Sequence, residues 1–164
     1  MQLTKSVRPS IGLAEIFPPE AIVVGLEART KQGVIGELVH HLVGLGHLAA
    51  SEEKTVVQSI LARERLSSTA LYNGIALPHC RTNVTEKFRG VLGLDPRGIP
   101  FDSMDGELVH TIFLLLAPLE GREQHYDILG RITAIGFNKS QQLQLRGCQT
   151  ADAACHFLQE LDRK

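Results

Sequence analysis

A histidine placed directly after a proline is the residue of this chain with the most evident chemistry. The segment NGIALPH (73–79) ends in His79. Its glycine permits close backbone approach, its apolar residues anchor the segment, and Pro78 fixes the turn that presents the imidazole. An imidazole nitrogen is a competent nucleophile near neutral pH, because its unperturbed pKa is about 6.5. The pattern therefore predicts a rigid, partly exposed histidine that offers one ring nitrogen.

The charged and hydroxyl-rich segment RERLSST (63–69) lies upstream and is suited to holding an anion. Phosphoryl transfer needs a presented nitrogen, donors for the equatorial oxygens of the phosphoryl group, and room for a partner's side chain. A phosphorus–nitrogen bond is labile, which suits a relay. We therefore interpret His79 as a phosphorylatable histidine. The candidate donors are Arg63, Arg65, Ser67, Ser68, Thr69 and, farther along the chain, His125.

Structural explanations compete with these roles. A lone histidine in an apolar segment is more often a core residue, and Arg63 can bind the last carbonyls of a helix. Ser68 and Thr69 are also common turn residues. Arg81, like Arg65, is expected at a solvated rim with a docking role.

The sequence does not predict a metal or nucleotide cofactor. His40 and His47 can share one helix face, but a zinc site needs about four ligands and no nearby pattern completes the set. The segment GLG (44–46) is not followed by the GK[ST] of a phosphate loop. Cys80 adjoins His79, but adjacent side chains seldom point together. The phosphoryl donor is therefore expected to be a protein.

The composition argues against nucleic-acid-binding, membrane and secreted proteins. The 164 residues suggest one domain, and a formal net charge of −1 gives no footprint for nucleic acid. No apolar run approaches the roughly 20 residues that span a bilayer, so direct membrane insertion is not expected. The N-terminus lacks a secretory signal, and three scattered cysteines fit a reducing compartment. We expect a cytoplasmic location.

Strand and helix signals alternate along the chain, with one irregular segment between them. Strands are predicted at 21–26, 90–94 and 109–116, with the last buried on both faces. Helices are predicted from the Thr30 cap to about 44, from Ser51 to about 64, over 121–137, and from the Thr150 cap onward. Residues 66–81 are predicted to be irregular and to carry His79. We expect a single α/β domain over 1–164, a mixed β-sheet flanked by helices, with residues 1–10 as a loosely ordered arm.

The residues around His79 resemble a known active-site signature. Arg63-Glu64, Ser68-Thr69 and the segment 74–79 are similar to enzyme IIA domains of the mannitol/fructose type. These domains belong to the bacterial phosphoenolpyruvate-dependent phosphotransferase system and include its nitrogen-regulatory branch. The resemblance extends from the first strand to the last helix.

This resemblance implies a mixed five-stranded sheet and a set of site roles. His79 would take phosphate from the histidine-containing phosphocarrier protein, and Arg63 would stabilise it. The family's second histidine falls on His125, which would hydrogen-bond the phosphate or the phosphorylated imidazole. The chain departs from the family at Leu71-Tyr72 and at Cys80, where glycines are usual. Those departures are expected to affect how the phosphocarrier docks or which downstream partner binds.

The downstream role stays open between three alternatives. A sugar-transport component would pass phosphate to an enzyme IIB domain, whereas a stand-alone regulator would bind a target protein according to phosphorylation state. The chain shows no linker to a fused domain, which favours the regulator. In both cases the protein is a phosphohistidine relay rather than a turnover enzyme. The third alternative is a non-catalytic binding module in which His79 is never phosphorylated.

Overall fold

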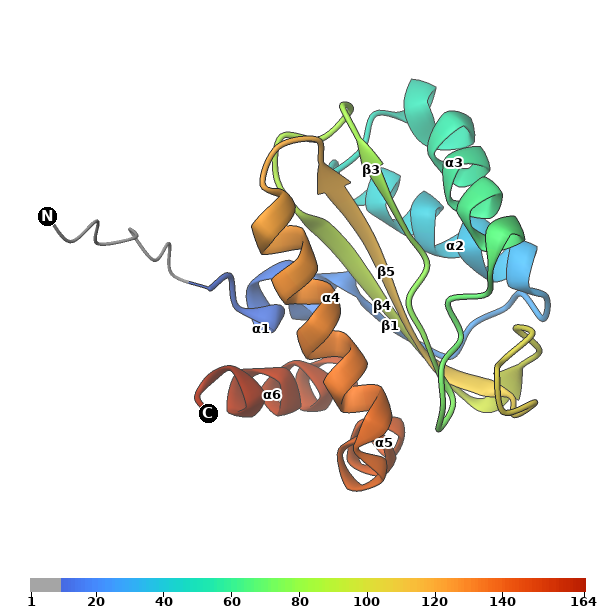
Figure 1. Cartoon of the computed structure of the whole chain (residues 1–164), viewed down its shortest axis with the longest axis vertical. Coiled ribbons are helices and arrows are strands. Elements are labelled where there is room, and N and C mark those ends of the chain that lie inside the picture. Colours follow the sequence, from blue (N-terminus) through green and yellow to red (C-terminus); the bar gives the residue numbers. More distant parts are fainter. Residues whose placement is uncertain (1–9) are drawn as a thin grey trace, which may run out of the picture.

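The computed structural model describes residues 10–164 as a mixed β-sheet with helices on both faces (Figure 1). The N-terminal arm expected at 1–10 therefore falls almost wholly outside the described residues. The elements, in chain order, are α1 (Leu13–Ile16), η1 (Pro19–Ala21), β1 (Ile22–Val24), α2 (Lys31–Gly44), η2 (Ala50–Glu52), α3 (Glu53–Leu66), β2 (Ile75–Ala76), β3 (His79–Thr82), β4 (Arg89–Ile99), β5 (Val109–Pro118), α4 (Arg122–Phe137), α5 (Lys139–Arg146) and α6 (Ala151–Asp162). The predicted α/β class with a mixed sheet flanked by helices is confirmed.

Strand β5 lies at the centre of the five-stranded sheet. The order is β1-β4-β5-β2, and β3 also pairs with β5. β4 and β5 are antiparallel, whereas β1, β2 and β3 run parallel to their partners. Every residue of β5 except Pro118 is buried, as its continuous apolar sequence predicts for a strand covered on both faces.

The two faces of the sheet support two apolar cores. Ile112, Leu114 and Leu116 of β5 pack toward α2 and α3, whereas Phe113 and Leu115 pack toward α1, α4 and α6. The alternation follows the two-residue period of a strand. Figure 1 shows the same division, with α2 and α3 on one side of the sheet and α4 and α6 on the other. β3 lies between α3 and α4 in this view.

Helix caps account for several of the boundaries. Thr30 accepts a hydrogen bond from Gly33 N at 3.1 Å, and Thr150 accepts one from Ala153 N at 3.1 Å. Both predicted caps are confirmed. Ser51 does not cap α3, because a 3-10 turn over Ala50–Glu52 precedes the helix, which then begins at Glu53.

The prediction of an irregular segment over 66–81 is wrong in part. Residues 75–76 and 79–82 form β2 and β3, both paired with β5. These strands are two and four residues long and are separated by Leu77 and Pro78, so they carry too little periodicity to be recognised. The short helices α1 and α5 were also not predicted. Among residues 10–164, no helix is long and apolar enough to cross a membrane.

Candidate functional site

His79 is the first residue of β3, opposite Leu115 of the central strand, and its side chain is half-buried. Its Nδ1 donates a hydrogen bond to Leu77 O at 2.7 Å, since a carbonyl oxygen can only accept. That bond fixes the tautomer and leaves Nε2 as the nitrogen with a free lone pair. Burial lowers the pKa of His79 below its usual value, and the charge of Arg63 lowers it further. A neutral ring with one available nitrogen is therefore favoured at physiological pH.

His125 approaches His79 from helix α4. The two ring centroids lie 5.6 Å apart with an interplanar angle of 73°. His125 is only 5% exposed, and its Nε2 has no hydrogen-bond partner among the described residues. Burial, with smaller effects of His79 and Arg81, lowers its pKa to about 4, which keeps the ring neutral. The structure thus brings together the two histidines that the sequence singled out.

Arg63 lies in the last turn of α3, on the other side of the sheet edge from α4. Its Nη1 donates to Ser67 O at 3.0 Å, so it also serves the helix-terminal role considered from the sequence. Its positive charge is close enough to lower the pKa of His79. Arg63 therefore places a cation near the imidazole without an ion pair to any described carboxylate.

The hydroxyls of Ser68 and Thr69 are directed to other partners. Ser68 Oγ donates to Phe101 O at 2.7 Å, and Thr69 Oγ1 donates to Glu64 Oε1. Glu64 is buried, accepts from Thr69 N at 3.1 Å, and pairs with Lys31 Nζ at 3.0 Å. Both hydroxyls thus brace the segment that follows α3. A direct bond from either one to a phosphoryl group would require it to exchange its present acceptor.

The turn before β2 depends on backbone conformations that favour asparagine and glycine. Asn73 and Gly74 have φ of 63° and 77°. Gly74 O accepts from His110 N and Thr111 N, which ties the turn to the start of β5. Tyr72, one of the departures from the family pattern, packs against Phe137 with ring centroids 5.7 Å apart. This contact is with the last residue of α4, at the opposite end of that helix from His125.

Cys80 points away from His79. Its side chain is buried in the core beneath α2 and α3, and burial raises the pKa of the thiol to about 11. A Cys–His nucleophile is therefore excluded by the geometry, since successive residues of a strand face opposite sides of the sheet.

Arg81 is closer to the site chemistry than the sequence indicated. It follows His79 by two residues on β3, so both project from the same face of the strand. Its guanidinium donates to Leu119 O, its Nε has no partner among the described residues, and its charge lowers the pKa of His125. This placement could be recognised only if 79–82 was known to be a strand.

Of the two histidines considered for zinc, His40 is engaged elsewhere, with its Nδ1 2.6 Å from Glu53 Oε1. The neighbouring His41 donates from Nε2 to Glu20 O at 2.7 Å. Within residues 10–164, no group of three or more histidine, cysteine, aspartate or glutamate side chains is placed to hold a metal ion.

Known proteins share this fold and resemble this sequence. A model of the family described as "Phosphoenolpyruvate-dependent sugar phosphotransferase system, EIIA 2" matches residues 15–161. The chain is 33% identical to a "Nitrogen regulatory protein" of Bradyrhizobium diazoefficiens, over 86% of this chain and 90% of that protein.

Among solved structures, the nitrogen regulatory protein IIA-Ntr of Neisseria meningitidis superposes with a TM-score of 0.81 at 28% identity, covering 88% of this chain and 97% of that one. Enzyme IIA-mannitol of Escherichia coli, solved in complex with phosphorylated enzyme IIB-mannitol, gives a TM-score of 0.72 at 23% identity over 88% and 99%. The resemblance expected from the sequence is confirmed. The chain belongs to the EIIA 2 family of the phosphoenolpyruvate-dependent sugar phosphotransferase system.

Proposed function

We propose that His79 accepts a phosphoryl group on Nε2 from the histidine-containing phosphocarrier protein and passes it to a downstream protein. The observation that carries this proposal is the hydrogen bond from His79 Nδ1 to Leu77 O. It fixes the ring, keeps the proton on Nδ1, and leaves Nε2 free beside His125. Positioning and electrostatic stabilisation are the main requirements of phosphoryl transfer.

The reaction requires no proton transfer on this chain. The Nε2 lone pair attacks the phosphorus of the donor's phosphohistidine, in line with the bond that breaks. A phosphorus–nitrogen bond forms to His79 as the donor's phosphorus–nitrogen bond breaks, and the electron pair of that bond returns to the donor imidazole. Nδ1 of His79 keeps its proton and donates it in the hydrogen bond to Leu77 O throughout.

Two side chains are proposed to stabilise the charge on the phosphoryl oxygens. Arg63 supplies a permanent cation from α3, and His125 supplies an unpartnered imidazole nitrogen from α4. A buried donor without a partner costs free energy, so a phosphoryl oxygen that accepts from His125 would relieve that cost in the phosphorylated state. Ser68 and Thr69 are proposed as secondary contacts that act after exchanging their present partners.

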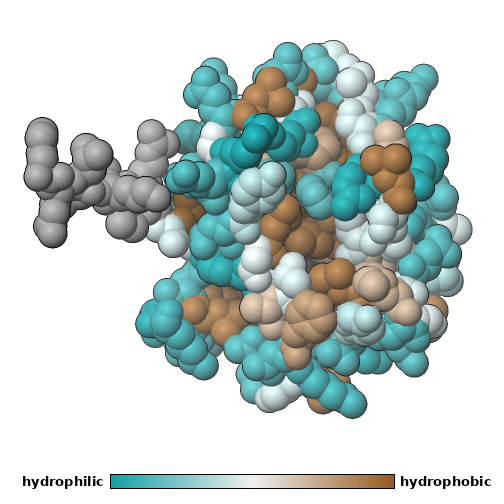
Figure 2. All heavy atoms as spheres, in the orientation of Figure 1, coloured by the Kyte–Doolittle hydropathy of each residue, from teal (hydrophilic) through white to brown (hydrophobic). Residues whose placement is uncertain are grey.

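The surface around the site favours a protein as donor and acceptor. Exposed apolar side chains adjoin three of the proposed site residues: Leu66 ends the helix turn that carries Arg63, the Leu119 carbonyl accepts from Arg81, and Tyr126 lies beside the ring of His125. In the orientation of Figure 1, Figure 2 shows apolar surface near the middle of the visible face, with polar residues around it. Apolar patches within a polar surround are typical of protein-interaction surfaces.

The acceptor is proposed to be a regulated target protein or an enzyme IIB domain. The similarity to nitrogen regulatory proteins favours the regulator. The mannitol relative in complex with its IIB partner supports the alternative. The proposed donor works in the cytoplasm, so the same proposal places this chain there.

The test is incubation with phosphoenolpyruvate, the first enzyme of the system and the phosphocarrier, followed by intact-mass measurement. We expect the mass of one phosphoryl group to be added, stable in base and lost in acid. The His79→Ala variant should gain none. An unchanged mass in the wild-type chain would instead support the binding-module alternative, in which His79 is not phosphorylated.

A further inference from the structure

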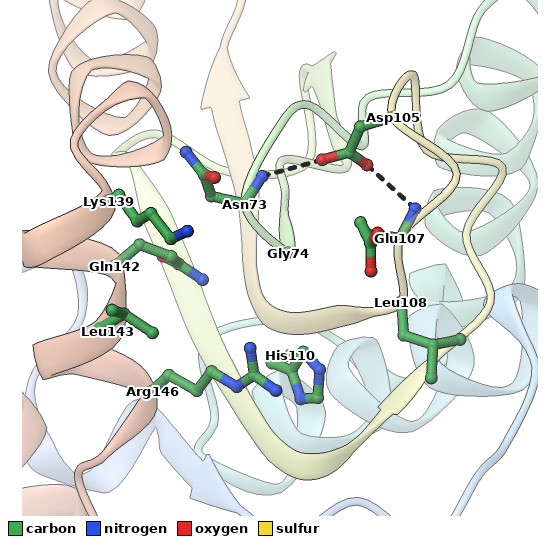
Figure 3. A pocket seen from close by; sticks show the side chains of 10 residues that line it. All are labelled: Asn73, Gly74, Asp105, Glu107, Leu108, His110, Lys139, Gln142, Leu143 and Arg146. Atoms are coloured by element: carbon green, nitrogen blue, oxygen red, sulfur yellow. Dashed lines mark hydrogen bonds between the residues drawn. The ribbon is translucent and has the colours of Figure 1, made fainter.

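A cavity lies at the end of the sheet where β5 begins, apart from the His79 site. Its volume is about 530 Å³, and it is bounded by α5 on one side and by the β4–β5 connection on the other (Figure 3). His79, His125 and Arg63 do not line it. The cavity is therefore separate from the proposed phosphorylation site, although Asn73 and Gly74, which line it, belong to the segment that leads to His79.

Opposite charges are divided between the two walls of the cavity. Lys139 and Arg146 extend from α5, and Asp105 and Glu107 belong to the facing connection, as Figure 3 shows. Asp105 accepts from Asn73 N at 3.1 Å and from Glu107 N at 3.0 Å, so its carboxylate is held by the backbone. Within the described residues, Lys139, Arg146 and Glu107 form no ion pair. The cavity thus has two free cationic groups facing one free carboxylate.

Gln142 gives this cavity a feature that a solvated surface groove would not have. It lies between the two cations on α5, lines the cavity and is only 1% exposed. Its Nε2 donates to Thr111 Oγ1 at 3.0 Å, and its Oε1 has no partner among the described residues. If the amide is turned over, Thr111 still bonds one amide atom and the other remains unpartnered. An unpaired buried polar atom costs about 1–3 kcal/mol, which a ligand donor would offset.

The floor of the cavity is formed by groups held in fixed positions. His110 Nδ1 donates to Asp95 O at 2.9 Å, which fixes the imidazole and leaves its Nε2 as an acceptor. A Cβ on Gly74 would lie 3.2 Å from Leu108 O and 3.3 Å from the ring of His110. The backbone there is in close contact with the floor, so the shape of the cavity depends on the glycine.

We propose that this cavity binds a neutral α-amino acid. The ligand carboxylate would lie toward Lys139 and Arg146, and the ammonium toward Glu107 and the free oxygen of Gln142. Asp105 and Glu107 would repel a polyanion, and Lys139 and Arg146 would repel a simple cation. A zwitterion therefore fits the charges of both walls. Leu108 and Leu143, 43% and 53% exposed, line the cavity and offer apolar contact to the ligand's side chain.

The test is titration of the ¹⁵N-labelled chain with L-leucine and with L-glutamine at millimolar concentrations, in a buffer that is neither zwitterionic nor an amine. We expect saturable shifts at the amides of Asn73 and Gly74 and at the side-chain amide of Gln142 with at least one of them. N-acetyl-L-leucine lacks the ammonium and L-leucinamide lacks the carboxylate. Each should bind at least about tenfold more weakly than L-leucine, which corresponds to about 1.4 kcal/mol. Absence of saturable shifts with both amino acids, or binding of inorganic phosphate alone, would overturn the proposal.

Variants that remove one charge from each wall test whether the ligand binds in this cavity. Glu107→Gln and Lys139→Gln are both at exposed positions and should each weaken binding about tenfold or more. Glu27→Gln and Lys54→Gln make the same charge changes at exposed positions away from the cavity and should leave binding unchanged. Equal affinities across all four variants would contradict the assigned site.

Gln142→Leu provides a separate readout, because it removes the unpartnered amide. It should abolish binding; it also leaves the buried Thr111 hydroxyl without its partner, so the melting temperature of the variant is measured to show that it still folds. If this variant does not fold, the wall variants still decide the question. His79→Ala should bind the amino acid normally, so failure of the phosphorylation proposal would be distinguishable from failure of this one.

Discussion

At the scale of single residues, the site depends on neutral imidazoles. His79 is held by one nitrogen and offers the other, and His125 is buried with a pKa of about 4. The sequence singled out both histidines and Arg63 as candidates from local patterns, and the structure places the two histidine rings 5.6 Å apart. The sequence could not reveal that Ser68 and Thr69 bond to Phe101 and Glu64, since those partners are fixed only by the tertiary fold.

The depressed pKa of His125 predicts a pH dependence of stability. The unfolded chain takes up this proton near the usual pKa of 6.5, whereas the folded chain takes it up only near 4. Between these values the unfolded state binds more protons, so stability falls as the pH is lowered from about 6.5 to about 4. Urea unfolding at a series of pH values should show a shallower fall for His125→Gln than for wild type. Equal slopes would show that His125 is not buried in its neutral form.

The charge of Arg81 predicts a second titration effect. Arg81→Gln should raise the pKa of His125, because it removes a cation that disfavours the imidazolium. The ring C–H resonances of His125, followed by NMR through an acid titration, measure this directly. Arg65→Gln, at an exposed arginine in the last turn of α3, is the matched control. A larger shift in the control than in Arg81→Gln would contradict the placement of Arg81.

At the scale of elements, short-range sequence patterns predicted the long helices and the central strand. They missed the short strands β2 and β3, which form by pairing with β5. The caps at Thr30 and Thr150 and the apolar run of β5 were readable because each is a contiguous pattern. β3 is a strand because it pairs with β5, and that pairing cannot be seen in the sequence. For this reason the sequence predicted Arg81 at a solvated rim and not on the same strand face as His79. The short helix α5 has too few residues to show a clear period.

The Thr30 cap gives a stability prediction for α2. Thr30→Ala removes the acceptor for Gly33 N and should destabilise the chain by about 1 kcal/mol, measured by denaturant unfolding. Thr55→Ala changes the same residue type at an exposed position inside α3 and should alter stability little, with a small gain from helix propensity. A loss in Thr55→Ala as large as that in Thr30→Ala would count against a specific capping bond.

At the scale of the whole molecule, the proposed site lies at a sheet edge where two layers meet. Arg63 approaches from the layer of α2 and α3, and His125 from the layer of α4 and α6. β3, between them, carries His79 on a strand that is fixed to the buried centre of the sheet. The arrangement places the proposed nucleophile between two proposed stabilising groups that come from different layers. The cavity beside α5 is a separate feature of the same fold.

The central claim is that His79 accepts the phosphoryl group on Nε2 because Nδ1 is bonded to Leu77 O. The most direct measurement is ¹⁵N–¹H correlation NMR of the histidine rings after phosphorylation by the phosphocarrier. We predict that phosphorus coupling and the large nitrogen shift appear at Nε2 of His79, with Nδ1 still protonated. Phosphorylation at Nδ1, at another histidine, or at none of them would contradict this account.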